Sequence, residues 1–122
     1  MVHLIFCLRR LPHLSRAEFQ HYWREQHAPL VKRHAAALGI RRYVQAHTID
    51  PAMSQAIAAS RGAPDPFDGV AELWFDWDDV TPRMTTPDAI EAGRQLLEDE
   101  RRFIDLPHSP IFFADDNVVI GG

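Results

Sequence analysis

The sequence has a single cysteine, Cys7, among its 122 residues, so no disulfide can form within the chain. It also has no apolar run long enough to cross a bilayer. The apolar residues 2–8 form a short stretch that is followed, rather than preceded, by Arg9 and Arg10, which is the wrong order for a secretory signal. These absences predict a protein of the reducing cytoplasm with no membrane partner.

Clustered positive charge is absent as well. The formal net charge is −4 and there is no Lys- and Arg-rich run, so the attraction that binds a phosphate backbone is missing and we expect no nucleic-acid partner. The six glycines form neither a GxGxxG nor a GxxxxGKS loop, and there is no GxSxG elbow. Nucleotide binding and acyl-serine chemistry therefore lack their usual motifs.

Histidines are frequent, but their spacing does not favour a metal site. His27 and His34 would lie about 10 Å apart along a helix, at ~1.5 Å per residue, whereas each ligand of a zinc ion lies ~2 Å from it. Haem binding has histidines available but no distinguishing motif. We therefore expect neither a metal nor a cofactor.

The composition, 46% hydrophobic and 25% charged, predicts one globular domain over residues 1–122. Apolar and polar residues alternate where strands are expected and follow the helical period elsewhere. The element order β-α-β-β-α-β predicts an α+β fold, the ferredoxin-like antiparallel sheet with two helices on one face. The expected strands are residues 2–9, 40–49, 70–77 and 111–120, the last with a bulge at 115–117, and the expected helices are residues 15–38 and 86–105.

Local signals mark the ends of both helices. Ser15 and Glu18 form a capping box, and Gly39 suits the left-handed residue after the first helix. Thr86 is expected to cap the second helix. Gly93, inside that helix, lowers its stability, which predicts a close approach of the helix to the sheet there.

Pro29 predicts an interruption of the first helix. Proline has no N–H and crowds the carbonyl four residues earlier, so the Glu25 carbonyl should be unpaired and Ala28 should leave the helical region. We therefore expect a kink or break where His27 lies.

Residues 50–66 are too many for a tight hairpin. Met53 and Ile57, four residues apart, predict a short helix within this insertion. Whether it is a lid or an excursion without function stays open.

Both faces of the first and third strands carry large apolar side chains, as Ile5 and Phe6 show. Helices can cover only one face, so the other needs a partner. A homodimer that pairs sheet to sheet is the simplest answer.

His27 is the leading candidate for chemistry, because it shares the helix stripe of Phe19 and Trp23 and should face the sheet. An imidazole in an apolar pocket is a natural general acid or base. The alternative is a structural histidine that donates to the carbonyl freed by the proline.

Tyr43 and His47 lie on one face of the second strand, where they would meet His27 if that face looks toward the helix. The alternative is that this face forms the dimer interface. His3 and Glu72 are polar groups on their strands, for which a satisfied structural role is the simpler interpretation. The charged run at residues 98–102 is expected to be a solvated helix face.

Four runs of the sequence resemble the EthD-type proteins of the dimeric α/β barrel superfamily. They are SRAEFQHYWREQHAPLV at 15–31, GIRRYVQAH at 39–47, DGVAELWFD at 68–76 and DERRFID at 99–105. The resemblance implies a ferredoxin-like protomer, a homodimer, and a pocket between helix and sheet. EthD-type proteins accompany ether-degrading cytochrome P450 systems, and the superfamily includes cofactor-free isomerases, polyketide cyclases, monooxygenases and haem-degrading enzymes. Its isomerases place around the substrate residues that would here be His27, Tyr43 and His47.

Two functions are weighed on this basis. The first is a small cofactor-independent enzyme, of isomerase, cyclase, lyase or oxygenase type, that acts on a hydrophobic oxygenated small molecule. His27 would move a proton and Tyr43 or His47 would polarise an oxygen. The second is a non-catalytic accessory or ligand-binding protein of a catabolic or P450 system. The expected substrate-binding residues are Phe19, Trp23, Trp74 and His3.

Overall fold

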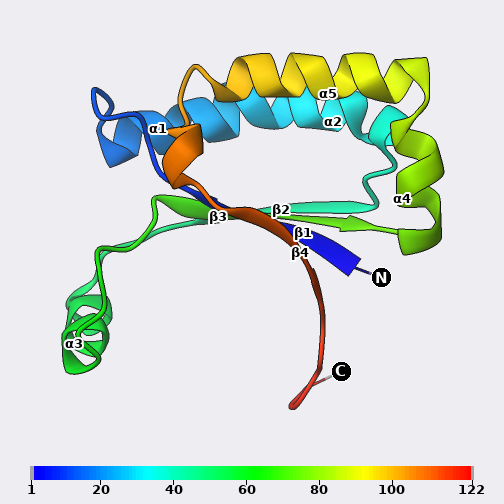
Figure 1. The fold of residues 1–122 in the computed structure, drawn as a ribbon. Coiled ribbons are helices and arrows are strands. Elements are labelled where there is room, and N and C mark those ends of the chain that lie inside the picture. Colours follow the sequence, from blue (N-terminus) through cyan, green and yellow to red (C-terminus); the bar gives the residue numbers. More distant parts are fainter. Residues whose placement is uncertain (1, 122) are drawn as a thin grey trace.

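The computed structural model describes residues 2–121, in which four strands form one antiparallel sheet of order β2-β3-β1-β4. The strands are β1 (Val2–Leu8), β2 (Arg42–His47), β3 (Gly69–Phe75) and β4 (Ile111–Asp115). Two long helical segments cover one face of this sheet (Figure 1). One comprises α1 (Arg16–Tyr22), the π-helix η1 (Trp23–His27) and α2 (Ala28–Leu38), and the other is α5 (Pro87–Glu100). The expected ferredoxin-like arrangement is confirmed.

The helix ends follow the local signals in the sequence. The Ser15 hydroxyl accepts from the Glu18 N–H at 3.1 Å, and the Glu18 carboxylate accepts from the Ser15 N–H at 2.9 Å, which completes the capping box. Gly39 ends α2 with φ 73°, in the left-handed region. Thr86 caps α5 through the Ala89 N–H.

The helix does not break at Pro29, and the expectation that Ala28 would leave the helical region is wrong. The regular α-helical turns are nevertheless interrupted where His27 lies, by the π-helix η1. Ala28 keeps helical dihedrals, with φ −57° and ψ −43°, and its N–H donates to the Trp23 carbonyl five residues earlier. A wider π turn thus accommodates the proline and keeps the backbone paired. The helix continues, but the extra residue in the turn changes which side chains face the sheet beyond it.

Further elements differ from the expected boundaries. β3 ends at Phe75, because Asp76 caps a helix that the sequence pattern does not predict, α4 (Trp77–Met84), and accepts from the Asp78 N–H at 3.2 Å. α5 ends at Glu100 and is followed by the short 3₁₀ helix η2 (Leu106–His108). β4 ends at Asp115 with no bulge.

Gly69 and Gly93 differ in how closely they are packed. The indole of Trp23 lies against Gly69, where any Cβ would overlap the ring, so the first residue of β3 favours glycine strongly. At Gly93 a Cβ would meet no atom within 4 Å, so the close approach expected there is absent. The space beside Gly93 belongs to the cavity described below.

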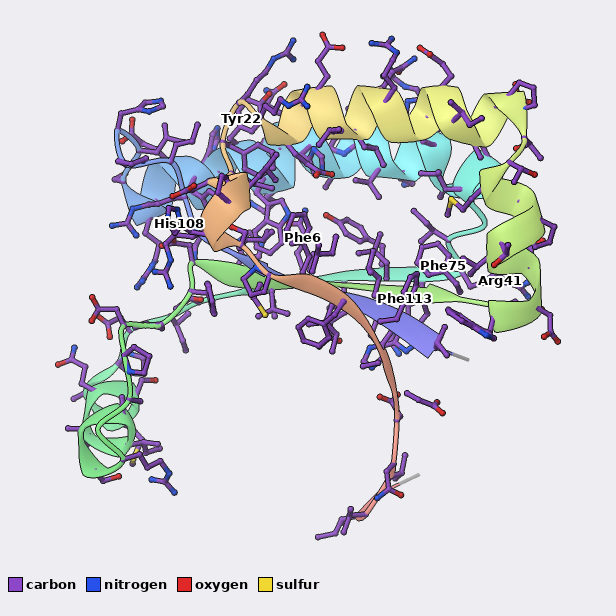
Figure 2. All side chains as sticks on the ribbon, in the orientation of Figure 1. Phe6, Tyr22, Arg41, Phe75, His108 and Phe113 are labelled. Carbon is purple, nitrogen blue, oxygen red and sulfur yellow. The ribbon has the colours of Figure 1, made fainter. Side chains whose placement is uncertain are left out.

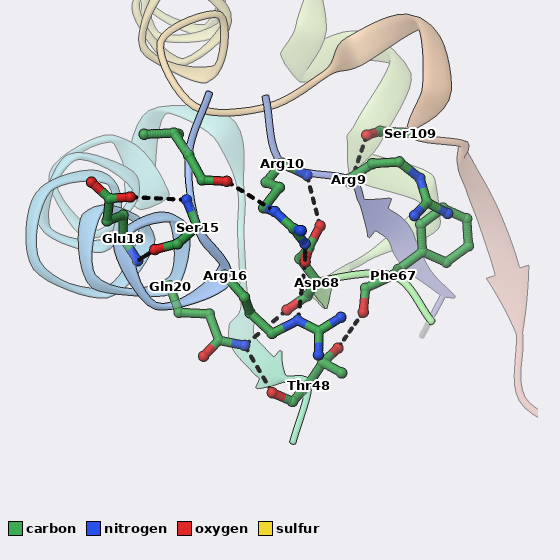
Figure 3. Close-up of polar contacts among 11 residues, drawn as sticks. Arg9, Arg10, Ser15, Arg16, Glu18, Gln20, Thr48, Phe67, Asp68 and Ser109 are labelled. Atoms are coloured by element: carbon green, nitrogen blue, oxygen red, sulfur yellow. Dashed lines mark hydrogen bonds and ion pairs between the residues drawn. The ribbon is translucent and has the colours of Figure 1, made fainter. Parts of the chain in front are cut away.

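A buried ion-pair network fixes the start of α1 on the sheet (Figure 3). The Asp68 carboxylate, 1% exposed, binds the Arg10 guanidinium, and the Arg16 Nε donates to it at 3.1 Å. Gln20 donates to the Asp68 carbonyl at 3.0 Å and to the Thr48 carbonyl at 2.9 Å. Charge-assisted hydrogen bonds of this kind are stronger than neutral ones, so the helix that carries Trp23 and His27 is anchored at its first turns.

The other face of the sheet has no covering element within residues 2–121. It carries Ile5, Val44, Trp74 and Phe112, which lie on the strand faces opposite the helices. The predicted short helix is present as α3 (Ala52–Ser60), but it projects away from the helical layer on the side of this open face (Figure 1). α3 therefore does not cover the space between the sheet and the helices of its own protomer.

Candidate functional site

An apolar cavity of about 270 Å³ lies between the sheet and the helices. Phe6 and Phe75 reach into the layer between them (Figure 2). Three polar side chains line the cavity: His27 from η1, Tyr43 from β2 and Glu100 from the end of α5. The apolar walls include Leu4, Trp23, Val31, Leu73, Leu96 and Ile104.

His27 is buried, 5% exposed, and forms a hydrogen bond between its Nδ1 and Oδ2 of Asp99 at 2.8 Å. Burial lowers the pKa of His27 below its ordinary value, despite the opposing hydrogen bond and charge of Asp99. The imidazole is therefore neutral at pH 7. Because an ionised carboxylate only accepts, Nδ1 carries the hydrogen and Nε2 keeps a lone pair that can take a proton.

Asp99 is held ionised by three donors. Burial alone would raise its pKa, but hydrogen bonds from Tyr22 and His27 outweigh burial and place the pKa below the usual value. The Tyr22 hydroxyl donates at 2.6 Å and the Arg102 guanidinium at 3.2 Å. A carboxylate fixed in this way orients the imidazole and stabilises its protonated form, as in the Ser-His-Asp arrangement.

Tyr43 supplies a hydroxyl to the cavity. Its oxygen accepts from the Gln45 amide at 2.9 Å, and we find no acceptor for its own O–H among residues 2–121. Burial raises the pKa of Tyr43, and the charge of Glu100 acts in the same direction. The hydroxyl therefore stays protonated and is free to donate to a bound molecule.

Tyr43 and His47 both face the helices, which answers the question that the sequence left open. His47 does not line the cavity; its ring packs on Trp23 with centroids 4.5 Å apart, and its Nε2 pairs with the Gln45 Oε1 at 2.8 Å. Gln45 also donates to the Trp23 carbonyl at 3.1 Å, the same carbonyl that accepts from Ala28 in the π turn. His47 and Gln45 thus brace the turn that presents His27.

The remaining expected binding residues lie elsewhere, apart from Trp23. Phe19 is fully buried in the core beside Phe103, with centroids 5.4 Å apart, and does not reach the cavity. Trp74 and His3 stack on each other at 4.9 Å on the open face, where the His3 Nε2 pairs with Asp116 at 2.7 Å. Side chains alternate between the faces of a strand, so residue 3 points away from the side that Leu4 and Phe6 occupy.

The sequence pattern does not identify Asp99 and Glu100 as site residues, because a charged run such as 98–102 predicts a solvated helix face. That expectation is wrong for both residues: Asp99 is 7% exposed and Glu100 lines the cavity. The helical spacing contained the signal, since 96, 99, 100 and 103 continue the buried stripe at intervals of three and four. Burial, and then the nearby charge of Asp99, raise the pKa of Glu100 to about 7.

The residues that the structure describes contain neither a candidate metal centre nor a membrane-spanning helix. Among residues 2–121 no group of three or more His, Cys, Asp and Glu side chains is placed to hold a metal ion. In the same residues no helix has the length and apolar character needed to cross a membrane.

Comparison with known families gives one match: the EthD domain, over residues 11–107. This chain belongs to the EthD family. The matched range contains His27, Tyr43, Asp99 and Glu100. A comparison with curated proteins gives no match.

Solved structures show the same EthD-like fold. An ethyl tert-butyl ether D family protein from Bacillus halodurans has 19% identity and a TM-score of 0.61, covering 96% of this chain and 99% of its own. A dimeric ferredoxin-like protein of unknown function from Thermobifida fusca has 13% identity and a TM-score of 0.57, covering 93% and 88%. SnoaB from Streptomyces nogalater, described as a cofactor-independent oxygenase, has 15% identity and a TM-score of 0.51, covering 99% and 97%.

Proposed function

We propose that this EthD-family protein is a small enzyme that needs no cofactor and moves a proton on a hydrophobic, oxygenated molecule bound in the cavity. One observation carries the proposal: the His27 ring lines an apolar cavity while its Nδ1 is bound by the buried Asp99 carboxylate. A neutral imidazole oriented by a carboxylate is a general base with a defined tautomer.

The chemistry follows from the three polar groups. The Nε2 of His27 takes a proton from a carbon or hydroxyl of the substrate, and Asp99 stabilises the imidazolium that results. Tyr43 donates its free O–H to the substrate oxygen on which negative charge develops. Removal of a proton from the carbon next to a carbonyl group can start an isomerisation, a cyclisation or an elimination. The description of SnoaB as a cofactor-independent oxygenase supports catalysis without a bound cofactor in this fold.

The second candidate is an accessory protein that binds the same class of molecule without changing it. The walls of the cavity are mainly apolar, which supports this function. Apolar walls bind a hydrophobic ligand even when no reaction takes place. The two functions differ in what happens to a bound, enolisable molecule, and that difference can be measured.

The test uses 2-tetralone, an enolisable ketone of two fused rings, in D₂O. We expect the protein to catalyse hydrogen–deuterium exchange beside the carbonyl, observed by NMR, and we expect His27→Gln to reduce that exchange by about 10²–10⁴-fold, the usual contribution of a general base. His34→Gln is the matched control, because His34 pairs with Gln95 and does not line the cavity. Exchange that survives His27→Gln would remove His27 from the mechanism, and binding without exchange in the wild type would favour the accessory role.

We also propose that the protein is a homodimer that joins two open sheet faces. The Thermobifida fusca protein of similar fold is dimeric and ferredoxin-like, and the open face carries Trp74, Val44 and Ile5 without a covering element among residues 2–121. The same face carries the polar side chains of Arg42, Glu72 and His3. A sheet face that leaves large apolar side chains uncovered is typical of an interface.

A further inference from the structure

The carboxyl group of Glu100 has no use in the mechanism above, although it lines the same cavity as His27 and Tyr43. We find no hydrogen-bond or ion-pair partner for it among residues 2–121. The Arg102 guanidinium, two residues away, binds Asp99 instead. Glu100 is half-buried, and a carboxylate without a partner in these mainly apolar surroundings is costly, so the surroundings favour the protonated form and raise its pKa to about 7.

The surroundings of Glu100 can be described element by element. On its own helix, Asp99 adds a negative charge. From β2 comes the neutral hydroxyl of Tyr43, and from η1 the neutral imidazole of His27. The cavity residues of β1, β3 and β4 are apolar, among them Leu4, Leu73 and Ile111. Burial among these side chains and the negative charge of Asp99 favour the neutral acid over the carboxylate and raise the pKa of Glu100 to about 7, while the neutral Tyr43 and His27 supply no positive charge against them.

We propose that Glu100 is a second acid–base residue of this cavity, a protonated carboxyl that donates its hydrogen to the oxygen of the bound molecule while His27 takes a proton from it. This inference rests on the proposed function and specifies the substrate. A protonated acid and a phenol both donate, so they fit a carbonyl oxygen, which accepts two hydrogen bonds. A neutral imidazole fits the acidic C–H beside that carbonyl. The geometry therefore favours an enolisable ketone or lactone without a charge of its own.

The size of the cavity narrows the class further. An apolar cavity of about 150 Å³ is sufficient to bind benzene. The present cavity of about 270 Å³ is less than twice that volume. This volume fits a compound of one or two rings.

The proton balance of the step closes within these residues. The substrate C–H bond breaks and its proton forms the N–H bond at His27 Nε2, while the electron pair forms the C=C bond of the enol. The carbonyl oxygen receives the proton of Glu100. The cavity then holds an imidazolium and a carboxylate, whose charges cancel. Return of the proton from His27 to the same carbon, and of the enol proton to Glu100, restores the ketone and both groups, which is the cycle that deuterium exchange reports. In a substrate whose enol is conjugated with a second C=C bond, return of the proton to the far carbon of that dienol shifts the double bond and completes an isomerisation.

The experiment measures the affinity for 2-tetralone by calorimetry between pH 6 and pH 8. Since an ionised Glu100 cannot donate, and its pKa is about 7, we expect wild-type affinity to fall about tenfold over this range. The pKa of His27 lies below its ordinary value, so His27 stays neutral through most of the range. Glu100→Gln, whose amide donates and never ionises, should bind equally well at both pH values. The matched control Glu98→Gln, at an exposed residue paired with Arg94, should retain the wild-type profile.

Naphthalene, which has the same ring skeleton without the oxygen, tests whether the hydrogen goes to the ligand. The preference for 2-tetralone over naphthalene should be greater at pH 6 than at pH 8 in the wild type. In Glu100→Leu, where Tyr43 alone still donates to the oxygen, the preference should be smaller than in the wild type at pH 6 and equal at the two pH values. An unchanged preference in Glu100→Leu, or a wild-type profile as flat as that of Glu100→Gln, would overturn the proposal.

Deuterium exchange separates this inference from the proposed function. We expect Glu100→Gln to bind 2-tetralone but to exchange it at least tenfold more slowly, because an amide cannot give up a proton. If exchange depends on His27 but not on Glu100, the proposed function stands and the catalytic role of Glu100 fails. If the wild type shows no exchange at all, the proposed function fails and the acid–base role of Glu100 fails with it.

Discussion

His27 Nδ1 lies 2.8 Å from Asp99 Oδ2, although 72 positions separate the two residues in the chain. The contact joins the π turn of the first helical segment to the last turn of α5, where Asp99 also binds Tyr22 and Arg102. Both helix ends are thereby fixed above the same region of the sheet. The shape of the site depends on this pair as much as on the cavity walls.

Asp99→Asn tests the orienting role of the carboxylate. An asparagine can offer an N–H to His27 Nδ1 and so favour the tautomer in which Nε2 carries the hydrogen and cannot act as a base. We expect catalysed exchange of 2-tetralone to fall by about 10²–10⁴-fold. The comparison is made at saturating 2-tetralone, because Asp99→Asn also removes a charge that raises the pKa of Glu100.

The control for this variant is a second His–Asp pair in the same chain. His108 Nδ1 and Asp105 Oδ2 are also 2.8 Å apart, but the His108 side chain is 71% exposed and neither residue lines the cavity. Asp105→Asn should leave exchange unchanged. Equal losses in the two variants would show that the measurement reports general damage rather than the tautomer of His27.

The sequence predicts the fold well because its signals are local and repeated. Alternation marks the strands, the Ser15 capping box marks a helix start, and the order of the elements selects the ferredoxin-like topology. The sequence pattern predicts that the third strand ends at Trp77, but it ends at Phe75. Trp77 continues the apolar pattern of the strand although it is the first residue of α4, and the capping residue Asp76 is the one local sign that a helix starts there. The helix continues through Pro29 because of the π turn, which Gln45 of β2 supports through its hydrogen bond to Trp23. Such a contact between residues far apart in the chain leaves no local pattern, so the sequence does not predict it.

The site is predictable only in part for a related reason. His27 and Trp23 can be placed against the sheet from helix periodicity, whereas the face of the second strand that carries Tyr43 stays open until the structure is known. Asp99 is not found in this way because a charged run usually means a solvated face, and the buried stripe of α5 that includes it is visible only when the spacing is followed to the helix end. His3 is expected from the sequence to bind substrate, but it lies on the open face of the sheet, away from the cavity. Periodicity shows which residues share a face of a strand and does not show which face the helices cover.

The pH dependence of stability should report on Glu100. Its pKa is raised to about 7 in the folded protein from an ordinary value of 4.5, so the folded state holds a proton that the unfolded state releases. Stability from this group is therefore present below pH 4.5 and is lost as pH rises toward 7. At ~1.36 kcal/mol for each pKa unit, a rise of this size corresponds to a total loss of about 3–4 kcal/mol, of which about 2–3 kcal/mol falls above pH 5.

Urea unfolding at pH 5 and pH 9 measures this contribution. Glu100→Gln should lose less stability between the two pH values than the wild type, by about 2–3 kcal/mol, whereas Glu98→Gln should not differ from it. His27 acts in the opposite direction, because its lowered pKa removes stability as pH falls below 6.5. Comparing each variant with the wild type cancels that effect, and identical slopes for Glu100→Gln and the wild type would contradict a buried, unpaired carboxyl.

Alanine at the two contrasting glycines should have opposite effects on stability. Gly69→Ala forces a methyl group against the Trp23 indole, and overpacking of this kind destabilises by about 1–3 kcal/mol. Gly93→Ala places a methyl group in open space within α5 and replaces a poor helix former, so it should stabilise by up to about 1 kcal/mol. Thermal unfolding compares the two, and a destabilising Gly93→Ala would show that the space beside residue 93 is filled.

Trp74→Glu tests the proposed homodimer. The variant removes a large apolar side chain from the interface and places a carboxylate beside Arg42, whose guanidinium lies 4.8 Å from the centre of the Trp74 ring. Burying such an ion pair costs more desolvation than its attraction returns, so the variant should shift to the mass of a monomer in light scattering. Ile90→Glu is the control, since Ile90 is 60% exposed on the helical layer that lies on the other side of the sheet. If Ile90→Glu dissociates the protein and Trp74→Glu does not, the subunits meet through their helices, and the open face with its stacked His3 and Trp74 is free for another partner.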